Sequence, residues 1–310
     1  MIGDAVRLTF KQVRFEALLL GGALLVLTVA LLAEAWRLQS LDLAACASGI
    51  ATPPVDCQRR LAEFDGQFMI VMLLEVVGAV LTVFGGLVLG VAVVGREIER
   101  GTTSLAWPLA RSRQRWLLQR WLVVGAGLVG ASLLVGWGVE ALSAAMRTAG
   151  RAGAFEGIEF RGPILAVRTL AAFTLAVFTG ALLGRTLPGL LIAVLVMPLL
   201  VLGVDWGMNA WLRSQAVRID MNETNDARIV DTEWRDVRNG QILSRLEYLT
   251  VTPPPDAAPD WDATTFEPIP IGVPGSRAGD YALMEVLLLS GTVALGLAGA
   301  SRVVERRTPY

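Results

Sequence analysis

The chain has 310 residues, of which 54% are hydrophobic and only 18% are charged, and its formal net charge is -1. A soluble protein with this composition would lack the polar side chains needed to cover its surface. The absence of histidine removes the commonest general base and the commonest metal ligand, and two cysteines alone do not complete a zinc site. We therefore predict an integral membrane protein with no metal site and no nucleic-acid partner.

Six apolar segments approach the roughly 20 residues that a helix needs to cross a hydrocarbon core about 30 Å thick. They run from Ala17 to Trp36, Phe68 to Val94, Trp116 to Met146, Ile164 to Leu183, Leu187 to Val204 and Ala282 to Ala300. Only Arg185 and Thr186 separate the fourth and fifth segments, so one long kinked segment is the alternative there. The first segment is longer than the roughly 7–15 apolar residues of a signal peptide, which favours a true span.

Basic residues are concentrated before the first span, between the second and third, and after the sixth. The positive-inside bias places these three segments in the cytoplasm, which predicts a multi-pass protein of the plasma membrane with both termini cytoplasmic. Cys46 and Cys57 then share the first external loop, where an oxidising exterior permits a disulfide. Two unpaired small residues are the alternative.

The predicted fold class is all-α integral membrane, with about six transmembrane helices in three regions. Spans one to five occupy 1–204, an external cap segment occupies 205–280, and the sixth span with its tail occupies 281–310. The segment 205–280 is too long for a connector. Asn239-Gly240 indicates a hairpin turn within it, and its proline-rich second half favours an extended return strand. A disordered loop is the alternative.

The connection after the second span combines residues that end helices with residues that begin them. Gly101 can end a helix, and Thr102 or Thr103 can cap the next one. The segment 103–110 then forms about two helical turns, and Ser112 can cap the third span. The apolar residues of this short helix are Leu105, Trp107 and Leu109. Such a helix would either transmit a displacement from a soluble partner to the spans or only anchor the loop at the membrane surface.

The same connection contains three short sequence elements: Glu97-x-Glu99-x-Gly101-Thr102, then Leu105-Ala106-Trp107, then Ser112-Arg113-x-Arg115-Trp116. These elements resemble the permease subunits of bacterial ATP-binding-cassette exporters. The chain is similar to the type-2 exporter class, in a form common in actinobacteria, where this segment is a coupling helix that docks into the ATPase subunit. The resemblance implies that Glu97, Glu99, Gly101 and Thr102 shape the elbow before the helix. It also implies that Leu105, Trp107 and Leu109 are docking residues.

A second element, Leu183-Gly184-Arg185-Thr186-Leu187-Pro188-Gly189, resembles the family's Gly-Arg-Thr-Leu-Pro sequence. Pro108 and the long acidic insert before the sixth span depart from the family pattern. The resemblance implies a cytoplasmic ATPase subunit, which holds ATP and Mg, and a second permease subunit that is identical or related. No Gly-x-x-x-x-Gly-Lys-Ser/Thr loop occurs in the chain, so we expect no cofactor and no ATP hydrolysis in this subunit.

Ionisable residues lie within the spans, near their external ends, at a cost that usually requires contact with protein or water. They are Glu34, Glu75, Glu140, Arg168 and Glu285. In one interpretation Glu75, Glu140, Arg168 and Glu285 line the substrate path, in a vestibule with excess negative charge. In the other, Arg168 pairs with one glutamate and the rest reach the headgroup region. Several span glycines would allow close helix contacts or are simply tolerated there: Gly85, Gly86, Gly90, Gly125, Gly127 and Gly130.

The functional prediction is a permease subunit that exports or extracts a small amphipathic molecule or lipid, using a separate ATPase subunit. The alternative is a membrane scaffold or signalling subunit that transmits ATPase motion to an external protein-binding domain. An intramembrane enzyme ranks last, because the spans contain neither histidine nor paired aspartates at catalytic spacing.

Overall fold

The computed structural model describes residues 2–46, 54–101, 112–148, 150, 152–221, 224, 226–237, 239–251 and 266–307. Within these ranges, six helices are long and apolar enough to cross a membrane. They are α1 (Ile2–Ser40), α2 (Val55–Glu99), α4 (Arg113–Thr148), α5 (Gly162–Leu183), α6 (Thr186–Gln215) and α8 (Ala278–Arg306). Each predicted span lies inside one of these helices. The predicted fold class, an all-α integral membrane protein, is therefore confirmed.

The fourth and fifth spans are separate helices. Gly184 follows α5 with φ +65 and its N–H donates to the Gly180 carbonyl at 2.9 Å. A left-handed residue often ends a helix, and glycine adopts this conformation without steric cost. Arg185 is then extended and α6 begins at the next residue. The alternative of a single kinked segment is wrong, because the glycine reverses the chain here.

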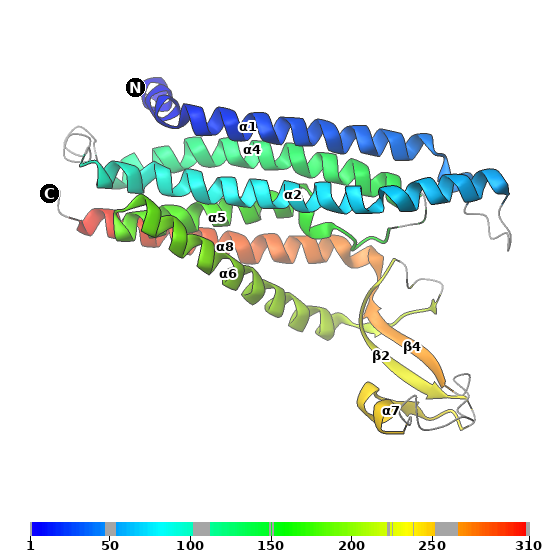
Figure 1. Ribbon diagram of the computed structural model, residues 1–310. Coiled ribbons are helices and arrows are strands. Elements are labelled where there is room, and N and C mark those ends of the chain that lie inside the picture. Colours follow the sequence, from blue (N-terminus) through cyan, green and yellow to red (C-terminus); the bar gives the residue numbers. More distant parts are fainter. Residues whose placement is uncertain are drawn as a thin grey trace.

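Both termini lie at one end of the helical bundle, and the strands lie at the other (Figure 1). We call these ends the termini side and the sheet side. The central helix is α5, which packs against α2, α4, α6 and α8, while α1 covers α4 and α2. Phe173 and Ala176, on α5, are fully buried.

Glycines bring α2 and α5 into close contact. A Cβ atom on Gly86 would lie 2.8 Å from the Thr169 carbonyl oxygen, and one on Gly90 would lie 2.7 Å from the Ala176 Cβ. Both distances are too short for any side chain, so the expectation of close helix contacts is confirmed at these two positions. It is wrong for Gly127 and Gly130, which face open space.

In the described part of the sheet side, four antiparallel strands pair in the order β1-β4-β2-β3. They are β1 (Val217–Arg218), β2 (Arg228–Asp236), β3 (Ile242–Leu243) and β4 (Phe266–Val273), and the short helix α7 (Arg245–Val251) follows β3. Gly240, with φ +72, donates its N–H to the Asp236 carbonyl at 2.8 Å between β2 and β3. The predicted turn and the predicted extended return strand, β4, are therefore both present.

Stacked aromatic rings join α7 to the sheet. The Trp234 and Tyr248 rings are parallel with centroids 4.1 Å apart, and the Phe266 ring meets Tyr248 edge-on at 5.4 Å. Aromatic pairs of this kind contribute about 0.5–1.5 kcal/mol beyond the area that they bury. The sheet therefore has a small apolar cluster of its own, outside the helical bundle.

Candidate functional site

The elbow at the end of α2 lies on the termini side, directly before the predicted coupling segment. Helix α2 ends at Glu99, and Gly101 has φ +69 and donates its N–H to the Ile98 carbonyl at 3.1 Å. Gly101 therefore ends the helix, as the sequence predicts. Thr102, Leu105, Trp107 and Leu109 lie outside the described residues. The chain resumes at Ser112, whose hydroxyl accepts the Arg115 N–H at 3.1 Å and caps α4.

A buried ion pair joins the end of α2 to α4. Glu97 Oε1 lies 2.6 Å from Arg120 Nη1, and the two side chains are only 11% and 9% exposed. The Arg120 guanidinium also lies over the Trp116 ring, 4.5 Å from its centroid. A buried pair of this kind does not add much net stability, but removing one partner leaves an uncompensated charge at a cost of about 3–5 kcal/mol. It therefore fixes the position of α2 against α4.

Two residues after Glu97, Glu99 joins α2 to the start of α6. Its carboxylate accepts the Thr186 backbone N–H at 2.9 Å and also accepts a short hydrogen bond from the Thr186 hydroxyl. A carboxylate at a helix N-terminus satisfies unpaired N–H groups and is favoured by the helix dipole. The two sequence elements that resemble exporter permeases thus meet directly, one through Glu99 and the other through Thr186.

A third side chain, Arg96, connects the same turn of α2 to α1. Its guanidinium lies 2.7 Å from Glu16 Oε1. Arg96, Glu97 and Glu99 therefore reach three different helices, α1, α4 and α6, from little more than one turn of α2. We call these three residues the α2 junction. Sequence reasoning placed Glu97 and Glu99 at the elbow but missed their partners, although opposite charges at the same end of neighbouring spans are a readable signal.

The end of α8 is held on the same side by two arginines that sequence reasoning did not single out as site residues. Arg307 donates to the Ala181 carbonyl at 2.9 Å, at the end of α5. Arg113, in the first turn of α4, donates to the Glu305 carbonyl at 3.2 Å and to the Arg307 carbonyl at 2.5 Å. The C-terminal ends of α5 and α8 and the start of α4 are therefore connected through backbone acceptors.

The four substrate-path candidates fall into two groups on the sheet side. Arg168 Nη2 lies 2.5 Å from Glu285 Oε1 and 3.8 Å from Asp205 Oδ1. Glu140 pairs with Arg147 at 2.7 Å and with Arg161 at 3.3 Å.

Glu75 belongs to the second group. A methyl group placed on Gly157, in the loop that carries Arg161, would lie 3.6 Å from Glu75 Oε1. The structure thus brings Arg168 together with Glu285, as one of the two interpretations expects. The shared aqueous vestibule stays a prediction.

The burial of Arg161 lowers the pKa of its guanidinium, and the nearby Glu140 carboxylate opposes that shift. Arg161 also donates to the Ala154 carbonyl at 3.0 Å and to the Glu156 carbonyl at 2.7 Å. These contacts fold the loop before α5 over the sheet-side ends of the helices.

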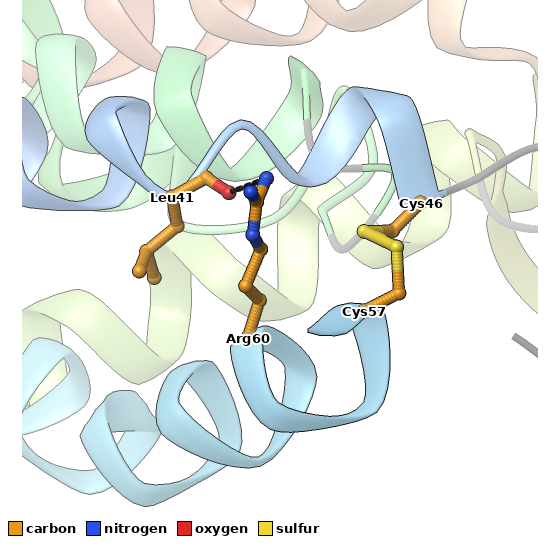
Figure 2. Close-up of a disulfide and its surroundings, with 4 residues drawn as sticks. All are labelled: Leu41, Cys46, Cys57 and Arg60. Atoms are coloured by element: carbon orange, nitrogen blue, oxygen red, sulfur yellow. Dashed lines mark hydrogen bonds between the residues drawn. A yellow bond between two sulfur atoms is a disulfide. The ribbon is translucent and has the colours of Figure 1, made fainter. Parts of the chain in front are cut away.

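A disulfide joins the short helical turn that follows α1 to the first turn of α2, on the sheet side. Cys46 and Cys57 are bonded with their Cα atoms 5.6 Å apart, which confirms the predicted bridge. Arg60, one turn into α2, donates to the Leu41 carbonyl at 3.1 Å beside it (Figure 2). The first two spans are therefore tied together at both ends, here covalently and on the other side by the pair between Glu16 and Arg96.

Within the described residues, six bilayer-length helices and a small sheet at one end of the bundle define a multi-pass membrane protein. The chain belongs to the family described as ABC-2 membrane transporter related, which matches residues 15–213. No curated protein and no solved structure matches it. The matched region includes the α2 junction and both sequence elements that resemble exporter permeases. The chain is therefore an ABC-type permease, a class of membrane subunit that works with an ATPase partner.

Proposed function

We propose that this permease exports or extracts a small amphipathic molecule or lipid, and that its ATPase subunit docks on the segment 103–110. The α2 junction is the observation that supports this proposal most directly. The segment is flanked by Gly101 at the end of α2 and by Ser112 at the start of α4. A displacement of the segment therefore acts on two spans at once.

The α2 junction offers a route for that displacement into further helices. Arg96 would carry it to α1 through Glu16, Glu97 to α4 through Arg120, and Glu99 to α6 through Thr186. Because the pair between Glu97 and Arg120 is almost fully buried, α2 and α4 would move together. In this mechanism the junction converts a local push into a concerted shift of four spans.

The same proposal includes the orientation of the chain in the membrane and its partner subunits. The termini side faces the cytoplasm, which the basic residues beside the first, second, third and sixth spans support. ATP and Mg are bound by the ATPase subunit, and this chain contributes no catalytic residue. A second permease subunit, identical or related, completes the transporter, in the form that the resemblance implies.

Docking is tested by replacing Leu105, Trp107 and Leu109 together with alanine. Tryptophan is a frequent interface anchor, and truncating such an anchor often costs 2 kcal/mol or more, which corresponds to about a thirtyfold loss of affinity. We expect the variant to insert normally but to copurify with less ATPase, or to lose coupled ATPase activity. Glu267→Gln, on the sheet side, is the matched control and should behave as wild type.

Normal assembly and normal coupled activity in the triple variant would contradict the docking role. A separate measurement, the ATPase rate of the reconstituted complex, distinguishes the transport function from the scaffold function. A transported ligand should stimulate ATP hydrolysis, whereas a scaffold should respond to a protein bound at the external sheet.

A further inference from the structure

A cavity of about 590 Å³ lies on the sheet side, at the opposite end of α5 from the α2 junction. Its walls come from the loop before α5, from α5, α6 and α8, and from the first residues of β2. A cavity of this size accommodates a small organic molecule. Its lining is mainly polar and charged, which distinguishes it from a lipid-filled groove between spans.

Negative charge exceeds positive charge in this cavity. The lining contains the carboxylates of Glu156, Glu159 and Asp205 and the guanidiniums of Arg168 and Arg228. A further carboxylate lies directly behind the wall, because Glu285 is fully buried against Arg168.

Arg168 is largely neutralised by its neighbours. It lies 2.5 Å from Glu285 Oε1 and 3.8 Å from Asp205 Oδ1. The second carboxylate oxygen of Glu285 is buried and has no hydrogen-bond partner within the described residues. The guanidinium is thus shared between two carboxylates, and the local charge stays negative.

Two carboxylates of the lining are available to a ligand. Both Glu159 and Glu156 line the cavity. Within the described residues, the Glu159 carboxylate has no ion pair and no hydrogen bond, and the Glu156 carboxylate accepts a single long hydrogen bond, from the Gly153 N–H at 3.4 Å. Unpaired carboxylates that face a partly enclosed space are strong acceptors for an ammonium group, since charge-assisted hydrogen bonds are about twice as strong as neutral ones.

Besides these charged groups and the amide of Asn209, the wall carries aromatic and apolar side chains. Phe155 and Tyr281 meet edge-to-face with their ring centroids 5.9 Å apart, and Ile229 lies beside them. The Arg228 guanidinium already lies 5.2 Å from the Tyr281 ring centroid, so this aromatic surface tolerates a cation. Apolar parts of a ligand would contact Phe155 and Ile229.

We propose that this cavity binds a small organic ammonium ion that carries an apolar substituent. Glu159 and Glu156 accept the ammonium hydrogen bonds, and Phe155, Tyr281 and Ile229 contact the apolar part. The ammonium group belongs either to a free amine or to a lipid headgroup, which share this chemistry. The proposal concerns binding alone and stands whether or not the segment 103–110 docks an ATPase.

The test measures binding of 4-phenylbutylamine to the full chain in a non-ionic detergent, by calorimetry, with empty micelles as the blank. The neutral analogue 4-phenylbutanol and the anion 4-phenylbutyrate have similar shapes. We expect the amine to bind at least tenfold more tightly than either analogue, and Glu159→Gln to reduce the amine affinity about tenfold. Glu267→Gln, a carboxylate at the far end of β4, is the control and should leave the affinity unchanged.

Equal affinity for the amine and the alcohol, tighter binding of the anion, or unchanged binding by Glu159→Gln would overturn the proposal. If Glu159→Gln does not fold, Ala227→Phe takes its place, because the larger side chain fills the cavity beside the start of β2. This variant should abolish amine binding, and intact binding would overturn the proposal. Competition by lysophosphatidylethanolamine but not by lysophosphatidylglycerol identifies a headgroup as the ligand. Amine binding without such competition identifies a free amine.

Discussion

Removing one side chain of the buried pair at the α2 junction tests whether it holds the two spans together. Glu97→Ala leaves Arg120 buried and without its carboxylate, which lies 2.6 Å away in the native protein. Since both side chains are about nine-tenths buried, solvent screens the lost interaction only weakly. We expect the free energy of unfolding to fall by about 3–5 kcal/mol.

A second variant separates the effect of an unpaired buried charge from the effect of losing the side chains' packing contacts. In Glu97→Leu/Arg120→Leu both charges are replaced by apolar side chains, and such replacements are often neutral or stabilising by about 1–4 kcal/mol. Loss of the buried contact between the guanidinium and Trp116 offsets about 2 kcal/mol of that. The double variant should therefore lie within about 2 kcal/mol of wild type and be more stable than Glu97→Ala.

The assay is reversible unfolding in mixed detergent micelles, followed by tryptophan fluorescence. The reasoning fails if Glu97→Ala lies within about 1 kcal/mol of wild type, or if the double variant is as unstable as the single one. Either result would mean that the charges are not effectively buried.

Three further predictions concern other parts of the molecule. Cys46→Ser opens a loop with a sequence separation of 11 and should lower the free energy of unfolding by about 2–3 kcal/mol; equal stability of oxidised and reduced wild type would contradict this. Glu99→Ala should reduce coupled ATPase activity with little change in copurification, because it removes the link to Thr186; unchanged activity would exclude that link from coupling. Hydrogen bonds from the Ser244 backbone and hydroxyl lower the pKa of Glu247. The carboxylate therefore stabilises α7 above its unfolded pKa of about 4.5 and loses that contribution as the pH falls through the folded value. Hydrogen exchange of α7 should show this loss, and Glu247→Gln should not.

Features that depend on nearby residues were predictable from the sequence. The spans follow from the length of their apolar runs, and Gly101 and Ser112 mark helix ends by their own backbone and hydrogen-bonding preferences. The disulfide was predictable because both cysteines lie in one short loop. The helix ends and the disulfide depend on residues that are at most 11 positions apart in the chain.

Pairings between spans were not predictable in the same way. The contact between Arg168 and Glu285 joins residues 117 positions apart, and that between Glu99 and Thr186 joins residues 87 positions apart. Which charges meet depends on how each helix is rotated and which helix lies next to it. Hydropathy does not carry that information, so the sequence indicated the charged residues but not their partners.

The length of α2 has a mechanical consequence. Its 45 residues span about 68 Å at 1.5 Å per residue, whereas a bilayer with its headgroups is about 40–45 Å thick. A helix of this length acts as a lever. One end is held by the contacts of Glu97 and Glu99, and the other end is bonded through Cys57 to Cys46, in the turn that follows α1. A tilt of about 5° around the first end would move the other end by about 6 Å, and the disulfide would carry the turn after α1 with it.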